Sequence, residues 1–311
     1  MRTPLPLLAI VGPTASGKTA LSIDVARALD GEIISMDSRQ VYRGMDIGTS
    51  KATAAERAAV PHHGLDLVDP RERFNAGRFA RLARGWVAEI QGRGRIPILV
   101  GGTGFFLRAL THPIFKEPPL DPSRRSALAH FHESLEDAEL HRWLQALDPP
   151  TADRLSAWGG RQRLLRALEL PLLTGRPLSW WHAEAPSEAP PLNPTTFVLD
   201  LPREVLHSAI DRRVGEMVER GLLREVAQLL GAGFDQGDPG MNATGYAELI
   251  PYLRGETTLE DALELVHRNT WAYARRQLTW LRNQLPDAVR LDGARPRAEL
   301  VDEIVRTTSP P

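Results

Sequence analysis

The stretch GPTASGKT at residues 12–19 limits the possible folds of this chain more than any other segment. Its spacing, G-x-x-x-x-G-K-T, is that of a phosphate-binding loop, in which backbone amides and a helix N-terminus surround an anion. The apolar run 7–12 leads into the loop, and a helical pattern with Leu21 and Val25 on one face follows it. A buried strand, a glycine-rich turn and a helix in this order predict a parallel α/β sheet with a phosphate site.

The loop alone does not say which phosphate it binds. Lys18 adds a positive charge to the loop, and the Thr19 hydroxyl stands where such loops hold Mg²⁺. ATP or GTP is the usual ligand of this motif, so nucleotide or ATP binding is the general expectation, with other phosphates left open. The alternative, a plain glycine turn with an exposed lysine, is disfavoured by the strand and helix on either side.

Two further buried strands are expected within 31–38 and 96–104. Their carboxyl ends deliver Asp37 and Thr103, and the first strand ends at Gly12. Because the carboxyl ends of parallel strands meet at one edge of a sheet, these three residues point to a single crevice.

Proline-rich segments at 112–122 and 184–194 mark two crossings between domains. Helical patterns with little strand signal lie between them, and 195–201 returns as a buried strand. The last third is mostly helical, with 288–292 as a late strand. The expected organisation is therefore a P-loop α/β core beginning at 1–119, a helical insertion at 120–190, and a return to the core with C-terminal helices at 191–311.

Asp37 allows three interpretations: a metal-holding aspartate, a general base for a nucleophile beside the phosphates, or the cap of the following turn. The segment 37–51 that it opens is rich in polar side chains and broken by glycines, which is typical of a recognition loop. Thr103, in a glycine-rich strand exit, either bonds a phosphate oxygen or belongs to a tight turn.

Arginine is concentrated in two segments. Residues 268–282 hold four arginines and no acid, with Arg268, Arg275 and Arg282 on one helical face. Residues 150–182 hold five arginines against two acids. Either segment alone is explained by a solvated helix face, but both together in a chain of net charge −1 favour a nucleic-acid partner.

Composition excludes several other classes of protein. There are no cysteines, so disulfides, thiol catalysis and cysteine zinc sites are absent. No apolar stretch approaches the ~18 residues of a membrane span, and we expect a soluble cytoplasmic protein without a membrane partner. His62–His63 lacks further ligands at metal spacing, and Trp180–Trp181 is typical of packing, so both pairs are interpreted as structural.

The sequence resembles a known family, the bacterial tRNA dimethylallyltransferases, also called tRNA isopentenyltransferases. The resemblance runs from about residue 7 to 282 in the family's order. The motifs that carry it include GPTASGKT, ISMDSRQVYRGMDIGTSK, VPHHGLDLVDP, ILVGGTGFFLRAL, RQRLLRALEL, TGYAEL and RRQLTWLR. The joint occurrence of the first, the second and the last motif is highly specific.

The resemblance implies a nucleoside-kinase-like core with a helical insertion that grips a tRNA anticodon stem-loop. It implies transfer of a dimethylallyl group from dimethylallyl diphosphate to N6 of the adenine immediately 3′ of the anticodon, with release of pyrophosphate. In this family the loop grips the diphosphate of that donor rather than ATP, Mg²⁺ is the cofactor, and a monomer is expected.

The resemblance also implies roles for individual residues. Asp37 is the expected general base, Thr103 lies beside the reacting centre, and Lys18 completes the catalytic set. The expected diphosphate contacts, with Mg²⁺ held at Thr19, are Gly12, Thr14, Ala15, Ser16, Gly17, Lys18, Thr19 and Arg213. The expected tRNA contacts are Asp37, Ser38, Arg39, Gln40, Thr103, Arg125, Gln162, Arg163, Arg166, Arg275, Arg276, Gln277, Thr279 and Arg282.

The sequence departs from the family's pattern at some positions. Ala209 stands where an arginine is common, and Ala247 replaces a basic residue of the TGYAEL stretch, which thins one expected tRNA-contacting loop. Three alternatives stay open: an adenylate isopentenyltransferase acting on free AMP or ATP, a P-loop small-molecule kinase, and a non-catalytic RNA-binding module.

Overall fold

The computed structural model describes residues 5–112, 115–116, 118–156 and 160–308. The chain forms two compact units, one comprising Met1–Thr111 with Leu192–Pro311 and the other His112–Pro191. The sequence prediction placed the helical insertion at 120–190; part of the proline-rich segment before it lies outside the described residues.

Six parallel strands form one sheet in the first unit, in the order β3-β2-β4-β1-β5-β6. This confirms the predicted α/β class with a parallel sheet. All four residues of β1 are buried, as expected for a strand covered on both faces. The strands are β1 (Leu8–Val11), β2 (Gly31–Ser35), β3 (His62–His63), β4 (Ile96–Gly101), β5 (Thr195–Asp200) and β6 (Val289–Asp292).

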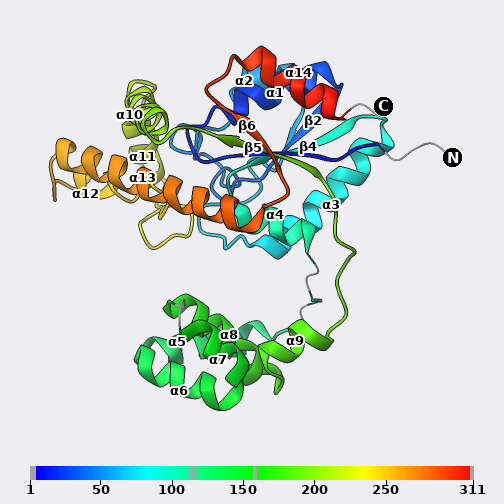
Figure 1. The fold of residues 1–311 in the computed structure, drawn as a ribbon. Coiled ribbons are helices and arrows are strands. Elements are labelled where there is room, and N and C mark those ends of the chain that lie inside the picture. The colour runs from blue at the N-terminus through cyan, green and yellow to red at the C-terminus, as the bar shows by residue number, and fades with distance from the viewer. Residues whose placement is uncertain (1–4, 113–114, 117, 157–159, 309–311) are drawn as a thin grey trace. The chain divides into compact units, whose positions relative to one another are not determined.

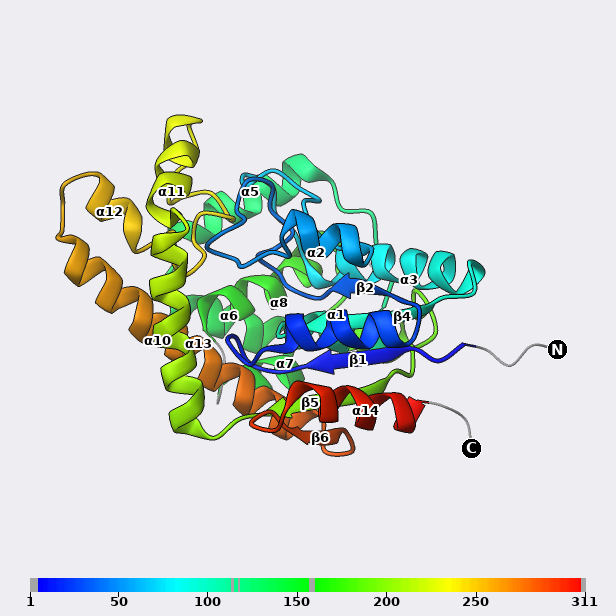
Figure 2. The same ribbon diagram turned by 90° about the horizontal axis from the view of Figure 1, so that it is seen from above.

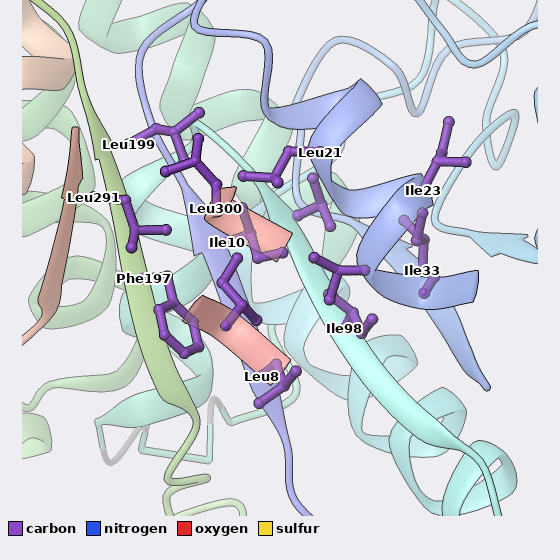
Figure 3. Close-up of a cluster of buried hydrophobic side chains, with 14 of the residues drawn as sticks. Leu8, Ile10, Leu21, Ile23, Ile33, Ile98, Phe197, Leu199, Leu291 and Leu300 are labelled. Carbon is purple, nitrogen blue, oxygen red and sulfur yellow. The ribbon is translucent and has the colours of Figure 1, made fainter. Parts of the chain in front are cut away.

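Helices cover both faces of the sheet (Figure 1). Helices α1 (Lys18–Ala28) and α14 (Arg297–Thr308) lie on one face, and α3 (Ala76–Gly92) and α4 (Gly104–Thr111) lie on the other. On the α1 side, Leu21 of α1, Ile10 of β1 and Phe197 of β5 belong to one apolar cluster (Figure 3). Truncating one such buried side chain to alanine costs about 2–5 kcal/mol, so this cluster fixes α1 on the sheet.

The remaining helices of this unit lie beside the sheet. Helix α10 crosses α13, and Leu206 and Ile210 of α10 pack against Ala274 (Figure 2). The long α13 begins at a Thr258 cap, whose hydroxyl accepts from the backbone N–H of Asp261. These helices are α2 (Ala54–Ala59), α10 (Arg203–Glu219), α11 (Leu222–Gly231), α12 (Leu249–Leu253) and α13 (Leu259–Gln284).

The second unit consists of helices around its own small core. Leu140 and Leu144 pack against Leu164 and Leu168, all four being buried. Asp148 joins two helices, because its carboxylate accepts from the backbone N–H groups of Thr151 and Ser179. The helices are α5 (Pro122–Glu133), α6 (Asp137–Leu147), α7 (Pro149–Ser156), α8 (Arg161–Thr174) and α9 (Leu178–Glu184).

Two predicted strand segments are longer than the observed strands. β2 ends at Ser35 and β4 ends at Gly101, so Asp37 and Thr103 lie in the turns that follow. Among the described residues, no helix is both long and apolar enough to span a membrane.

Candidate active site

The loop between β1 and α1 has the geometry of an anion cradle. Ala15 and Gly17 have φ angles of 62° and 82°, in the left-handed region, and Gly17 caps α1 without any side-chain bond. At Gly12, an added Cβ would lie 2.8 Å from Ser16 Oγ, so only glycine fits beside that side chain. The first amides of α1 therefore face outward from a closely packed turn, ready for an anion.

Two cations stand at the mouth of this loop. Burial, together with the charge of Arg213, lowers the pKa of Lys18 to about 8, although the charge of Asp37 acts in the opposite direction. The Lys18 ammonium donates to the Pro13 carbonyl at 3.0 Å. Burial likewise lowers the pKa of Arg213, which has no salt bridge within the described residues. Buried positive charges that feel nearby carboxylates but form no salt bridge within the described residues are suited to a polyanionic ligand.

A pocket with about 590 Å³ of empty space, part of it open to solvent, connects these cations with Asp37. Its lining brings together seven of the site residues expected from the sequence, namely Thr14, Lys18, Thr19, Asp37, Gln40, Arg213 and Gln277. Ser16, another expected diphosphate contact, is buried and its hydroxyl has no hydrogen-bond partner in the part of the chain that the structure describes. An unsatisfied buried hydroxyl beside the cradle is what a site for phosphate or a hydrated cation would use.

Asp37 is held by its own turn. Its Oδ1 accepts from the backbone N–H of Arg39 at 2.8 Å, and the backbone N–H of Ser38 donates to Thr103 Oγ1 at 3.1 Å. The turns after β2 and β4 are thus joined at the pocket. One carboxylate oxygen of Asp37 therefore caps the following turn, as one of the three interpretations predicts. Asp37 also lines the pocket, which is where a general base would lie.

The side chain of Gln277 contacts other parts of the protein, which the sequence did not predict. It was predicted to contact tRNA, but its side chain is buried at 6% exposure. Its Oε1 accepts from the Thr14 backbone N–H at 2.8 Å, and its Nε2 donates to the Gly102 carbonyl at 2.9 Å. An added Cβ at Gly102 would lie 2.1 Å from that Nε2, which explains the glycine. Gln277 therefore fixes the phosphate loop to the exit of β4.

Tyr273, one turn before Gln277 on α13, was missed by the sequence analysis. It lines the pocket, where burial and the charge of Asp37 raise its pKa to about 12. The hydroxyl therefore stays protonated at neutral pH. Its position in the stretch RNTWAYARRQ gave no signal, because an isolated tyrosine on an amphipathic helix is typical of ordinary packing.

The recognition loop 37–51 is fixed by residues far away in sequence. The carboxylate of Glu225 on α11 accepts from the backbone N–H groups of Asp46, Ile47 and Gly48 at 2.8–3.1 Å. Tyr246 donates its hydroxyl to the same carboxylate at 2.6 Å. A carboxylate with four donors is strongly held, so the loop is anchored to α11.

Tyr246 also changes the interpretation of the TGYAEL stretch. This stretch was expected to form a tRNA-contacting loop, but Tyr246 is fully buried, and burial together with the Glu225 charge raises its pKa. An added Cβ at Gly48 would lie 2.4 Å from the Tyr246 ring. Buried Lys51 closes the other end of the loop, with its ammonium 2.7 Å from Asp46 and 2.6 Å from Asp66. Tyr246 thus belongs to the support of the loop.

Two polar residues of the recognition loop are also used within the protein. Gln40 donates to the carbonyls of Thr49 and Ser50 and accepts from the Ser35 hydroxyl. Arg39 donates to the Pro239 carbonyl at 3.0 Å. Both remain partly exposed.

The arginine face expected on α13 is present. Arg268, Arg275, Thr279 and Arg282 are exposed, while Ala274 and Leu281 on the adjacent face are buried. The Arg276 guanidinium lies 5.8 Å from the centroid of the Tyr273 ring. Since 268–282 contains no acid, this helix face presents uncompensated positive charge.

The predicted tRNA contacts of the helical unit lie on two helices. Gln162 and Arg163 are exposed at the start of α8. Arg125 on α5 and Arg166 on α8 both pair with Glu169. Because two arginines share one carboxylate, the group keeps a net positive charge.

The histidine pair is engaged inside the protein. His63 Nε2 lies 2.7 Å from Glu32 Oε2, and His62 Nδ1 lies 2.7 Å from the Val60 carbonyl. Within the described ranges, no group of three or more ligand-type side chains could hold a metal ion.

The parallel sheet, the loop after β1 and the pocket at the carboxyl ends define an α/β protein with a P-loop kinase-like fold. A family model described as IPP transferase matches residues 40–284, and one described as Isopentenyl transferase matches residues 5–62. The chain belongs to the IPP transferase family.

Relatives and solved structures agree with this assignment. The chain is 43% identical to a tRNA dimethylallyltransferase from Syntrophobacter fumaroxidans, over 99% of this chain and 89% of that protein. The full-length tRNA isopentenylpyrophosphate transferase of Bacillus halodurans has a TM-score of 0.70 at 39% identity and covers 97% of this chain and 95% of its own. The structure of a eukaryotic dimethylallyltransferase acting on tRNA has a TM-score of 0.83 at 29% identity. The match covers 98% of this chain and 80% of that chain.

Proposed function

We propose that this protein is a tRNA-modifying prenyltransferase, transferring a dimethylallyl group from dimethylallyl diphosphate to N6 of the adenine 3′ to the anticodon. The observation that carries this proposal is the pocket lined by Lys18, Arg213 and Asp37 together, in a chain of this family. Lys18 and Arg213 are suited to binding a diphosphate, and the Asp37 carboxylate is suited to accepting a proton from the nucleophile.

The diphosphate end supplies most of the driving force for bond cleavage. The amides of the loop, Lys18 and Arg213 stabilise the negative charge that grows on the leaving diphosphate as the allylic C–O bond breaks. The residues at this end fit Mg²⁺, since Thr19 lines the pocket and the neighbouring Ser16 hydroxyl lacks a partner among the described residues. When bound, Mg²⁺ would neutralise phosphate charge as a Lewis acid.

The nucleophile end depends on Asp37. Adenine N6 is a weak nucleophile because its lone pair is delocalised into the ring. As the new C–N bond forms, the N6 proton passes to the Asp37 carboxylate, which contributes about 10²–10⁴-fold in rate. The hydrogen bond from Arg39 N–H to Oδ1 holds the carboxylate in one orientation, so it is ready before the base arrives.

The RNA is held by positive charge outside the pocket. Arg275 and Arg282 on α13, with the exposed arginines of the helical unit, contact backbone phosphates, which gives affinity without base specificity. The target adenine must leave its stack to reach the pocket, and this costs less in a loop than in a duplex.

The decisive experiment offers labelled dimethylallyl diphosphate and Mg²⁺ with unmodified tRNA in one reaction and with AMP in another. Label in tRNA alone is the expected result. Label in AMP would make the protein an adenylate isopentenyltransferase. ATP-dependent phosphoryl transfer without any prenylation would indicate a kinase, and tRNA binding without any turnover would indicate an RNA-binding module.

A further inference from the structure

One aromatic side chain beside the pocket is left uncovered. Phe105 directly follows Gly104, the first residue of α4, and is 61% exposed. The other exposed large apolar side chains of the described residues are between 37% and 47% exposed. Single exposed apolar residues are common on protein surfaces, so exposure alone does not assign a role. Its surroundings do.

The packing of α4 holds Phe105 on the outside. The next residue, Phe106, is buried and stacks on Phe79 of α3, with ring centroids 4.2 Å apart and an interplanar angle of 12°. On the other side, Gly104 is pressed against Trp280 of α13, since an added Cβ would lie 2.3 Å from the indole. Because α4 is fixed between α3 and α13, it cannot rotate to bury Phe105 without breaking both contacts.

Along the chain, Phe105 lies between Gly101, which lines the pocket, and the exposed Arg108. Thr103, two residues earlier, is tied to the Ser38 amide beside Asp37. Arg108, one turn later, is exposed and donates to Gln284 at the end of α13 at 3.2 Å. Neither 100–112 nor 268–282 contains an acid. An exposed aromatic ring beside arginines is the combination that single-stranded nucleic acids bind, through base stacking and phosphate contacts.

We propose that the Phe105 ring is a stacking platform for an unpaired base that neighbours the adenine entering the pocket. This inference rests on the proposed function, with an RNA loop as the substrate. When the target adenine leaves its stack, the neighbouring base loses a stacking partner, and a rigid aromatic ring at the rim of the pocket replaces it. Phe105 thereby offsets part of the energy needed to extrude the adenine.

The test compares Phe105→Ala, Phe105→Leu and Phe105→Tyr with Leu82→Ala, a control that removes an exposed apolar side chain from α3. KM for tRNA and KM for dimethylallyl diphosphate are measured for each. Alanine is expected to raise the tRNA KM about 5- to 150-fold, the range for loss of one stacked base, and to leave the donor KM unchanged. Tyrosine should stay within about threefold of the parent, and the control should be unaltered.

Two results would overturn the stacking role. One is a Phe105→Ala tRNA KM within about twofold of the parent, and the other is a leucine variant as good as tyrosine, which would mean a general apolar contact. A binding measurement gives a second readout: 2-aminopurine placed 3′ of the target adenine in an anticodon stem-loop should be quenched by the parent and not by Phe105→Ala. If the parent itself does not prenylate tRNA, the proposed function fails instead, so the two failures are distinguishable.

Discussion

The phosphate loop and the recognition loop both line one pocket, and they are built in different ways. The phosphate loop supplies most of its anion-binding groups from residues 12–19, as backbone amides and Lys18, and remote residues add only Arg213 and the bond from Thr14 N–H to Gln277. The recognition loop 37–51 is held by Glu225 and Tyr246, which are about 180 and 200 residues away in sequence. The loop suited to a common chemical group is thus mostly local, whereas the loop expected to select a particular nucleophile depends mainly on tertiary contacts.

The largest expected effect of a single substitution is at Asp37. Asp37→Asn keeps an oxygen that accepts from Arg39 N–H but removes the base, so the single-turnover rate should fall about 10²–10⁴-fold with tRNA binding nearly unchanged. Rapid-quench measurements with saturating tRNA check this. A retained single-turnover rate would remove Asp37 from the role of base.

The support of the recognition loop should be the next most sensitive point. Glu225→Ala leaves three backbone N–H groups without their acceptor, at about 1–3 kcal/mol for each that stays unsatisfied. We expect kcat/KM for tRNA to fall at least about tenfold while the affinity for the diphosphate donor is unchanged.

Glu219→Ala, which truncates an exposed glutamate on α10, is the matched control for Glu225→Ala. Equal loss of donor and tRNA binding in Glu225→Ala would mean that the whole unit is destabilised, which thermal unfolding would also reveal. The comparison between local and tertiary support would then lose its basis.

A pH dependence is expected at the phosphate end. Because the pKa of Lys18 is lowered to about 8, its ammonium is present below pH 8 and is lost as the pH rises through that value. Pyrophosphate affinity should therefore fall above pH 8, by at most about tenfold per pH unit. Calorimetric titrations of the parent and Lys18→Gln between pH 7 and 9.5 separate this effect from ionisation of the anion. Equal pH slopes in the two proteins would contradict it.

The smallest expected effect is on the arginine face of α13. Arg275→Ala should weaken tRNA binding at all sequences and reduce the slope of log K against log salt by about one. Arg224→Ala, at an exposed position of α11, should leave this salt slope unaltered. An unchanged slope in Arg275→Ala would mean that this arginine lies away from the phosphates.

Much of the fold followed from the sequence because its signals are local. The strand, loop and helix around Gly17 are specified by neighbouring residues, and the proline-rich segments drew attention to the helical region. The roles of Gln277 and Tyr246 could not be read in this way. The family resemblance implies a tRNA contact at Gln277, but at that register of α13 the side chain is buried and its amide satisfies two backbone groups. Which side of a helix faces a partner that is remote in sequence cannot be read from a motif.

The position of Gln277 has a consequence for how the two substrates communicate. Helix α13 presents Arg275 and Arg282 outward, and on its inner side Gln277 grips the backbone of Thr14 in the phosphate loop. If bound RNA shifts this helix, the bond from Gln277 to Thr14 carries the shift to the backbone of the phosphate loop. By thermodynamic linkage the effect is reciprocal: whatever factor bound RNA brings to donor affinity, bound donor returns to RNA affinity. One amide side chain thereby links the helix that presents the arginines to the loop that would bind the donor.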